Sequence, residues 1–309
     1  MRLSGVNADC YNVDMHTWLK CGSISLGQKA WETCLLQSGA RVMGVTSRGL
    51  FLLTPPQRIL FVSVEHVRSP LTITLDRACD QLRRLEIGAA ARFSGTRLVF
   101  PTIELSVSLS ADAMWQCPLP AAAPRPRAEQ TRVLQSIAQA VLARRGYVGL
   151  AALLPALLDR PEAASLSTEH AAILDQLIAL RCTVQMGGSR RIIDGLTSLL
   201  GQGRGLTPSG DDMVMGFLLM LNRWRTDYDS LALNQAVIEA AYQCTTTISA
   251  NLIECAADGQ GDERLIAVAD GIATGTASID ECAEFILDWG SSSGIDALAG
   301  MALAITSQG

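Results

Sequence analysis

Lysine and histidine are scarce in this chain of 309 residues, which contains only Lys20, Lys29 and three histidines. The glycine-rich segment near residue 205 therefore lacks the lysine that a Walker-type phosphate loop uses. The nine cysteines form no C-x-x-C pair and are odd in number, which fits neither a zinc site nor a disulfide framework. This cysteine usage is typical of a reducing compartment, so we expect a cytoplasmic protein.

Long apolar runs are also lacking. No segment reaches the roughly 18 uncharged apolar residues of a membrane span, and we expect no secretory signal, because the N-terminal residues contain no apolar stretch. The basic residues are dispersed rather than clustered, which argues against nucleic acid as a partner. With 49% hydrophobic and 18% charged residues, the chain can nevertheless bury large cores.

A proline-rich segment, 117–128, divides the chain into two parts of different texture. Proline fixes φ and cannot donate a backbone hydrogen bond, so this segment is typical of an extended linker. Residues 1–127 carry 14 basic against 9 acidic residues, whereas residues 128–309 carry 11 against 21. We therefore predict two domains, 1–116 and 129–309, joined by the linker 117–128.

The two parts predict different secondary structure, and together an α+β fold. Short β-branched or apolar runs separated by glycine or proline predict a β-rich, barrel-like first domain. Its clearest strands are expected at 41–46, 49–54, 59–64 and 71–75, with a helix at 77–86 and further strands at 98–100 and 103–109. After the linker, apolar residues at three- and four-residue intervals predict an α-helical domain. Its helices are expected at 130–143, 168–186, 190–200, 213–225, 231–257, 263–273, 279–287 and 295–305.

One pattern, S-G-x-D-x-x-x-G, occurs twice in the helical part, at 209–216 and 293–300. Ser209 and Ser293 are suited to the N-cap of a helix, with Asp212 and Asp296 in the acidic position of a capping box. Because the first turn of a helix carries unpaired N–H groups and a partial positive charge, it attracts anions. The repeated pattern therefore predicts a phosphate- or carboxylate-binding centre. A purely structural alternative is a pseudo-symmetric helix crossing, in which the two final glycines permit close approach.

The lead-in to the first copy is rich in glycine, at 201, 203, 205 and 210. Glycine lets backbone amides approach a ligand and adopts positive φ, while Arg204 adds a fork of donors for phosphate or carboxylate. A capped helix alone explains Ser209 and Asp212 but neither the glycines nor Arg204, so we favour a binding site. Successive helical residues point about 100° apart, so Asp211 and Asp212 would rarely reach one Mg²⁺ ion. We expect Asp212 to cap or orient while Asp211 faces a ligand.

A third polar segment, 245–254, carries threonine, serine and asparagine on an otherwise apolar helix. Exposed helix faces usually carry lysine, arginine and glutamate, so these small hydrogen-bonding groups make Ser249 and Asn251 reasonable substrate contacts. An exposed polar face is the alternative.

These segments resemble a known family. G-Q-G-R-G-L-T-P-S-G-D-D at 201–212, T-x-I-S-x-x-L at 246–252 and S-S-G-x-D-x-L-x-G at 292–300 are similar to the family of the AllH subunit of oxamate carbamoyltransferase. The resemblance covers most of the helical part and extends more loosely to the β-rich part. It implies a transferase of allantoin catabolism and purine degradation, a multi-subunit complex of three different chains. The implied reaction is phosphorolysis of oxalurate to oxamate and carbamoyl phosphate.

The motifs indicate an anion-binding site, and the substrates that the resemblance implies, carbamoyl phosphate, phosphate and oxamate, are all small anions. We hypothesise that the amides of Gly210–Asp212 and the Arg204 side chain hold phosphate. The candidate catalytic residues are Arg204, Ser209, Asp211 and Asp212. The candidate substrate-binding residues are Gly203, Gly205, Thr207, Gly210, Ser249, Asn251, Ser293, Gly294 and Asp296. We expect no cofactor, with Mg²⁺ as the alternative. Two other functions remain open: a non-catalytic subunit that binds an effector or supports another chain, and a small-molecule phosphotransferase.

Overall fold

The computed structural model describes residues 18–146, 149–159, 168–186, 189–224 and 230–306. It divides into two compact units. The first comprises Met1–Pro56, Leu60–His66 and Leu71–Met114; the second comprises Gln57–Ile59, Val67–Pro70 and Trp115–Gly309. The first unit is built on strands and the second mainly on helices, which confirms the predicted α+β fold.

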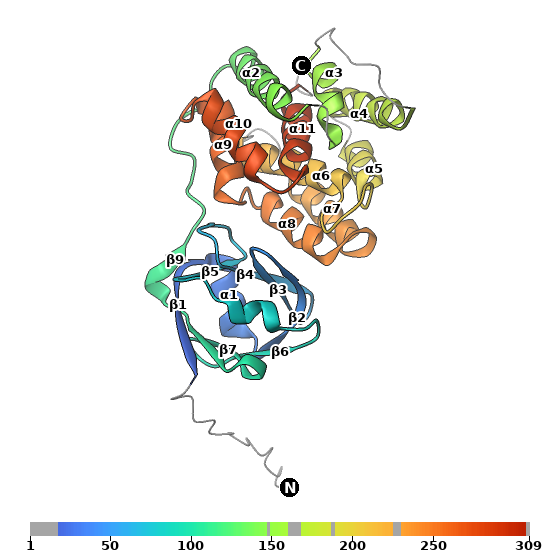
Figure 1. The fold of residues 1–309 in the computed structure, drawn as a ribbon. Helices are drawn as coiled ribbons and strands as arrows, with labels where there is room; N and C mark the ends of the chain where they lie inside the picture. The colour runs from blue at the N-terminus through green and yellow to red at the C-terminus, as the bar shows by residue number, and fades with distance from the viewer. Residues whose placement is uncertain (1–17, 147–148, 160–167, 187–188, 225–229, 307–309) are drawn as a thin grey trace. The chain divides into compact units, whose positions relative to one another are not determined.

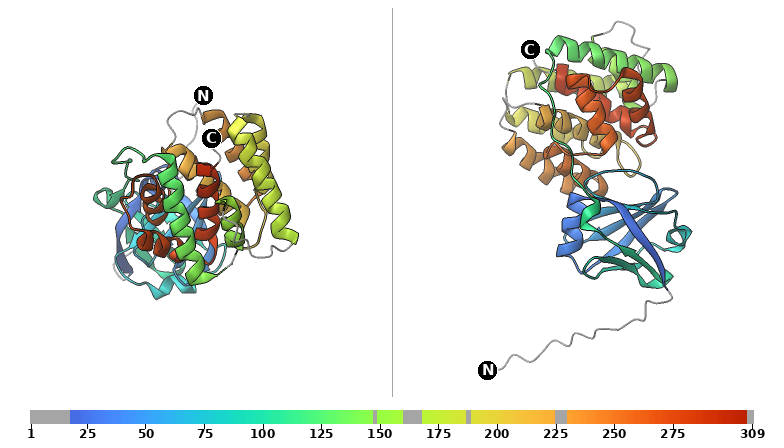
Figure 2. Two further views of the ribbon diagram at one scale, coloured as in Figure 1. Left: turned by 90° about the horizontal axis from the view of Figure 1, so that it is seen from above. Right: turned by 90° about the vertical axis from the view of Figure 1, so that its left-hand side faces the viewer.

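Eight strands of the first part of the chain form a closed barrel (Figure 1, Figure 2). They are β1 (Leu19–Gly27), β2 (Gly39–Thr46), β3 (Gly49–Thr54), β4 (Arg58–Ser63), β5 (Thr72–Leu75), β6 (Ala90–Phe93), β7 (Arg97–Phe100) and β8 (Leu105–Ser108). The order around the barrel is β5-β4-β3-β2-β6-β7-β8-β1, and the antiparallel pairing of β1 with β5 closes it. A short ninth strand, β9 (Met114–Trp115), lies beside β1.

The barrel encloses its own apolar core. Along β6 exposed and buried residues alternate, so that Ala91 and Phe93 face inward, as the two-residue period of a strand requires. The helix α1 (Gln28–Leu36) connects β1 to β2. The described part of this unit also contains the 3₁₀ turns η2 (Asp80–Arg84), η3 (Pro101–Ile103) and η4 (Ala111–Ala113). The helix predicted at 77–86 is thus only the 3₁₀ turn η2.

The second unit is a bundle of helices. Its elements are α2 (Arg127–Arg145), η5 (Gly149–Leu153), α3 (Leu154–Leu157), α4 (Thr168–Met186), α5 (Ser189–Leu199), α6 (Ser209–Trp224), α7 (Leu231–Cys244), α8 (Thr247–Ala257), α9 (Glu263–Thr274), α10 (Ile279–Asp288) and α11 (Ser293–Thr306). None of the helices in the described ranges combines the length and apolarity needed to cross a membrane.

Two helices, α6 and α11, form the centre of this bundle, and both begin with the repeated pattern. Residues 210–221 of α6 and 294–305 of α11 are all buried. A helix that is apolar on all sides packs inside a domain rather than on its surface. Figure 1 shows α11 surrounded by α2, α3, α6 and α10, and these neighbours contact it.

The single helix predicted at 231–257 is interrupted. Thr245 adopts an extended conformation, with φ −133° and ψ −170°, and it separates α7 from α8. Thr246 then caps α8 by accepting the N–H of Ser249. Apolar periodicity continues across the break, so the sequence pattern predicted one helix where hydrogen-bonding threonines end one helix and start another.

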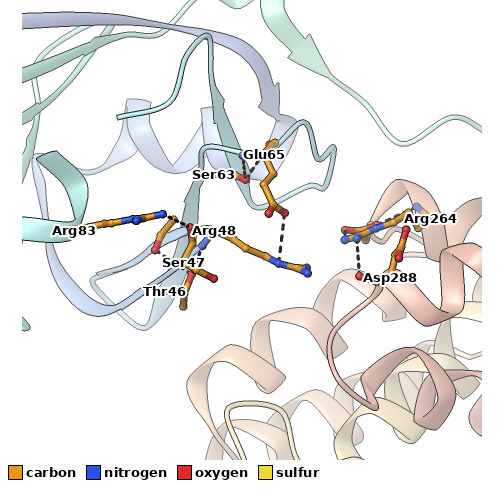
Figure 3. Close-up of polar contacts among 10 residues, drawn as sticks. Thr46, Ser47, Arg48, Ser63, Glu65, Arg83, Arg264 and Asp288 are labelled. Carbon is orange, nitrogen blue, oxygen red and sulfur yellow. Dashed lines mark hydrogen bonds and ion pairs between the residues drawn. The ribbon is translucent and has the colours of Figure 1, made fainter. Parts of the chain in front are cut away.

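Polar contacts fix turns in each unit (Figure 3). In the first unit, Arg48 after β2 forms a half-exposed ion pair of 3.5 Å with Glu65. In the second unit, Arg264 binds both oxygens of Asp262 at 2.9 Å and donates to the carbonyl of Asp288 at 3.0 Å. Since Asp288 is the last residue of α10, this bond fixes the point from which the chain enters α11.

Candidate functional site

The two copies of the repeated pattern pack directly against each other, which confirms the close crossing considered as an alternative. A Cβ atom added at Gly216 would overlap the carbonyl oxygen of Ala297, and one at Gly300 would overlap that of Met213. Met213 and Ala297 hold the same place in their copies, one residue after the aspartate. Glycine at both positions therefore allows backbone-to-backbone contact between α6 and α11 with pseudo-twofold symmetry.

The serines and aspartates of the two copies are exchanged across this crossing. The hydroxyl of Ser293 on α11 lies beside the carboxyl of Asp212 on α6 and favours its ionised form. Reciprocally, the hydroxyl of Ser209 on α6 lies beside the carboxyl of Asp296 on α11 and favours its ionised form. The repeat therefore builds one joint polar cluster in which each helix supplies one hydroxyl and one carboxyl to its neighbour.

Both carboxyls of this cluster are buried. Asp212 is 2% exposed and Asp296 is 0% exposed. Burial, above all, raises the pKa of Asp212 well above its ordinary value, and the charges of Asp296 and Asp211 act in the same direction. Burial likewise raises the pKa of Asp296, against the lowering effect of hydrogen bonds from the Leu150 amide and nearby serines. One oxygen of each carboxyl, Oδ2, has no hydrogen-bond partner within the described part of the chain.

The capping geometry predicted for the two serines is wrong by one residue. Ser209 and Ser293 are the first residues inside their helices, and the preceding residues provide the helix-starting carbonyls. Pro208 accepts the N–H groups of Asp211 and Asp212 at 2.9 and 3.1 Å, and Ser292 accepts that of Asp296 at 3.0 Å. The serine hydroxyls are therefore turned toward the aspartates of the other helix.

The backbone amides that we expected to hold phosphate are already engaged. Gly210 N–H donates to the Gln202 carbonyl at 2.9 Å, and those of Asp211 and Asp212 donate to Pro208. The equivalent amide of Gly294 donates to the Trp289 carbonyl at 2.9 Å. In this conformation these helix starts therefore offer no spare donors at the predicted positions. An anion would have to bind elsewhere on the glycine loop.

Asp211 fastens the glycine loop to its surroundings. Its carboxylate is 1% exposed and accepts the Gly201 N–H at 2.7 Å and the hydroxyl of Thr245. Asp211 therefore orients the loop, whereas Asp212 retains an unpaired oxygen. Asp211 thus has the orienting role that the sequence led us to expect of Asp212.

Thr246 ties the same loop to the start of α8. Its hydroxyl donates to the Leu206 carbonyl at 2.7 Å and accepts the Ser249 N–H at 3.1 Å. The Ser249 hydroxyl lies 3.1 Å from that of Thr246 and is buried. Ser249 thus supports the loop through Thr246.

Asn251 is wholly used in holding backbone segments together. Its Nδ2 donates to the Gln57 and Thr247 carbonyls at 2.9 and 2.8 Å, and its Oδ1 accepts the Ile59 N–H at 3.2 Å. The side chain is 0% exposed. The structure therefore supports neither the substrate contact nor the exposed polar face considered for Asn251.

The outer rim of the loop, Gly203–Thr207, remains open. Gly203, Arg204, Gly205 and Leu206 are exposed, and Gly203 and Gly205 adopt φ of 118° and 103°, which favours glycine. Among the described residues, no hydrogen-bond acceptor is present for the amides of these rim residues, and the Arg204 side chain forms no ion pair. The Thr207 hydroxyl lies 3.1 Å from that of Ser293.

The structure thus joins most of the predicted residues into one site on the loop and the starts of α6 and α11. The backbone amides of the rim and the Arg204 side chain are exposed hydrogen-bond donors, whereas the carboxyls of the three aspartates are buried. Sequence reasoning missed Thr245, Ser292 and the Leu150 amide, which donates to Asp296 at 2.8 Å. The run of three threonines at 245–247 could have indicated the break between α7 and α8, but its apolar surroundings indicated a continuous helix. Leu150, 146 residues from Asp296, gave no signal.

Residues 199–305 match the family model described as oxamate carbamoyltransferase subunit AllH. The match covers 107 of the 309 residues and includes both copies of the repeated pattern and the start of α8. It confirms the similarity to the AllH family for this part of the chain. No curated protein and no solved structure matches the chain.

Proposed function

Because residues 199–305 are similar to the AllH family, we propose that the chain is a subunit of a carbamoyltransferase that acts on oxalurate or oxamate and carbamoyl phosphate. The observation that carries this proposal is the open rim of the glycine loop. There, unpaired amides and the exposed Arg204 lie beside the hydroxyls of Thr207 and Ser293. Amide and guanidinium donors suit phosphate and carboxylate oxygens.

The proposed reaction needs positioning more than a protein nucleophile. A phosphate oxygen attacks the carbamoyl carbon of oxalurate, a C–O bond forms, and the bond from that carbon to the oxamate nitrogen breaks. The oxamate nitrogen takes up the proton that the attacking hydrogen phosphate loses, and carbamoyl phosphate is released. Holding two small anions in line and stabilising the oxygen that becomes negative supplies much of the rate enhancement. Arg204 and the rim amides would hold the phosphate, and Thr207, Ser209 and Ser293 would orient the carbamoyl group.

Calorimetric titration of the purified chain with carbamoyl phosphate tests this assignment. We expect Arg204→Ala to weaken binding about tenfold or more, because it removes charge-assisted hydrogen bonds. Arg191→Ala is the matched control, since Arg191 is exposed on the neighbouring α5 and should leave the affinity unchanged. Equal affinity of wild type and Arg204→Ala would show that the anion does not bind at the rim.

A non-catalytic subunit is the second candidate, and one feature favours it. Within the described residues, the titratable side chains at the site are Arg204 and three buried aspartates, and one of these, Asp211, fastens the loop. Such a set offers few groups for chemistry. Assaying oxalurate phosphorolysis with and without the other subunits of the complex separates the two candidates. Turnover that requires these subunits yet survives Arg204→Ala and Ser209→Ala would identify a supporting role.

A further inference from the structure

The two unpaired oxygens beneath the glycine loop are unusual for a domain core. Asp212 and Asp296 are 2% and 0% exposed, and each has one Oδ2 atom without a hydrogen bond to any described residue. Their partners are neutral: serine and threonine hydroxyls and one backbone N–H. A buried carboxyl oxygen without a partner costs free energy. These atoms therefore mark a position where a ligand would supply the missing partners.

The pair offers both kinds of hydrogen-bonding group. Burial raises the pKa of both carboxyls, and the charge of Asp296 raises that of Asp212 further, so the site favours a protonated carboxyl more than an exposed aspartate would. A protonated carboxyl donates one hydrogen bond, and a carboxylate accepts several. A pair that holds one proton thus presents one donor and one acceptor.

We propose that Asp212 and Asp296 form a subsite for a primary amide group, –CO–NH₂. The protonated carboxyl donates to the amide oxygen, and the carboxylate accepts an N–H from the amide nitrogen. The identity of the ligand as oxamate, or the carbamoyl end of its precursor, rests on the proposed function. The subsite itself rests on the geometry of the two helices.

Other ligands fit these atoms less well. A phosphate or carboxylate would face two acidic groups and no basic side chain among their hydrogen-bond partners. A metal ion would have few charged ligands, because the described residues contain no group of three or more His, Cys, Asp and Glu side chains that could hold one. An amide is uncharged and carries both a donor and an acceptor, which the pair can satisfy together.

The path to this subsite leads through the Thr207–Ser293 hydrogen bond. Both hydroxyls are partly exposed, lie 3.1 Å apart, and are close enough to the carboxyl of Asp212 to favour its ionised form. Separation of these hydroxyls would open the carboxyl pair toward the rim of the loop. The anionic half of oxamate would then lie outward, near Arg204, with the amide inward.

Oxamate and oxalate form a matched pair of probes, because oxamate carries an amide where oxalate carries its second carboxylate. In calorimetric titrations of the full chain near pH 7, we expect the affinity for oxamate to exceed that for oxalate by about tenfold or more. Asp296→Asn should reduce this ratio several-fold, mainly by increasing the affinity for oxalate, because it replaces the carboxyl whose pKa is raised less, and which therefore ionises first, with a neutral amide. A gain of oxalate binding cannot arise from misfolding. Asp175→Asn, an exposed change on α4, is the control and should keep the wild-type ratio.

Equal affinities of the wild type for the two probes would overturn the subsite, and so would a ratio that Asp296→Asn leaves unchanged. If neither oxamate nor oxalate binds, the subsite is also overturned, because all the side chains proposed to form it belong to this chain. Mg²⁺ binding that Asp212→Asn abolishes, without a preference for oxamate, would identify a cation site instead. The carbamoyltransferase proposal fails separately: preferential oxamate binding without phosphorolysis in the assembled complex would retain the subsite and reject the reaction.

Discussion

At the scale of single residues, Gly216 and Gly300 determine how closely α6 and α11 approach. A side chain at either position would overlap a backbone carbonyl of the other helix, and backbone cannot move aside as a flexible side chain can. We expect Gly216→Ala to lower the free energy of unfolding of the helical unit by about 1–3 kcal/mol. Urea denaturation followed by circular dichroism measures this loss.

Gly44→Ala is the control for the crossing. Gly44 lies in β2, has no positive φ, and has nothing near the position of an added Cβ atom. Its replacement should change the stability by less than about 0.5 kcal/mol. A Gly216→Ala variant as stable as Gly44→Ala would mean that the helices do not cross as closely as the structure shows.

Asp212 should make the helical unit less stable as the pH rises. Its pKa in the folded state is raised, so between about pH 4, the ordinary value for aspartate, and that raised pKa, the folded state binds more protons than the unfolded chain. Stability therefore decreases with increasing pH across this window. The carboxylates facing Asp212 are Asp211 on its own helix and Asp296 on α11.

Melting temperatures of the wild type and Asp212→Asn at several pH values between 4 and 8 test this linkage. The asparagine variant cannot ionise at this position, so we expect its melting temperature to increase relative to that of the wild type as the pH rises. Asp175→Asn, on the exposed side of α4, should follow the wild type. Parallel curves for all three proteins would contradict a raised pKa at Asp212.

The residues of the candidate site were only partly predictable. The motif spacing was sufficient to predict that 209–212 and 293–296 begin helices and carry polar groups. It could not show that Ser209 and Ser293 point across to the opposite helix, because that depends on the crossing at Gly216 and Gly300. Nor could it show that Asn251 binds the Gln57 and Ile59 backbone, since these residues are more than 190 positions apart.

At the scale of elements, the start of α8 supports the glycine loop through one hydroxyl. Thr246 both caps α8 and donates to the Leu206 carbonyl. We expect Thr246→Ala to lower stability by about 1 kcal/mol through loss of the cap and also to weaken binding of carbamoyl phosphate. Thr246→Ser keeps the hydroxyl and should therefore retain both the stability and the affinity for carbamoyl phosphate of the wild type. Thermal melting and calorimetric titration give the two readouts.

Ser278→Ala separates capping from loop support. Ser278 caps α10 in a full capping box with Glu281, and its described contacts do not involve the glycine loop. Its loss should cost a similar free energy while leaving the affinity for carbamoyl phosphate unchanged. If both alanine variants reduce affinity equally, general loosening of the helical unit, and not the Thr246–Leu206 bond, is responsible.

Elements with a clear hydrophobic period were predictable, and those defined by polar side chains were not. α4 and β3 were predicted with their observed bounds, and β2 was predicted to begin two residues late, because alternation or helical spacing continues to or near their ends. The strand β1 and the helix α1 were missed. The boundary between α7 and α8 was missed as well, since it depends on Thr245 reaching Asp211, on another helix.

At the scale of the whole molecule, the chain contains two apolar cores that share no residue. The barrel core includes Leu98, and the core of the helical unit includes Phe217 and Leu298. Because each core is contiguous within one unit, we expect each to melt cooperatively, so that calorimetry shows two transitions rather than one. The family match, 199–305, falls entirely in the second unit, so loss of the proposed ligand site should follow only one of them.

Two variants assign the transitions. Leu98→Ala removes a fully buried side chain from the barrel and should cost about 2–5 kcal/mol, which lowers one melting temperature by several degrees. Gly216→Ala should lower only the other. Carbamoyl phosphate should raise the transition that Gly216→Ala lowers, because a ligand stabilises the unit that binds it. If instead a single transition responds to both substitutions and to the ligand, the two cores fold as one cooperative unit, and the helical part alone does not determine the stability of the site.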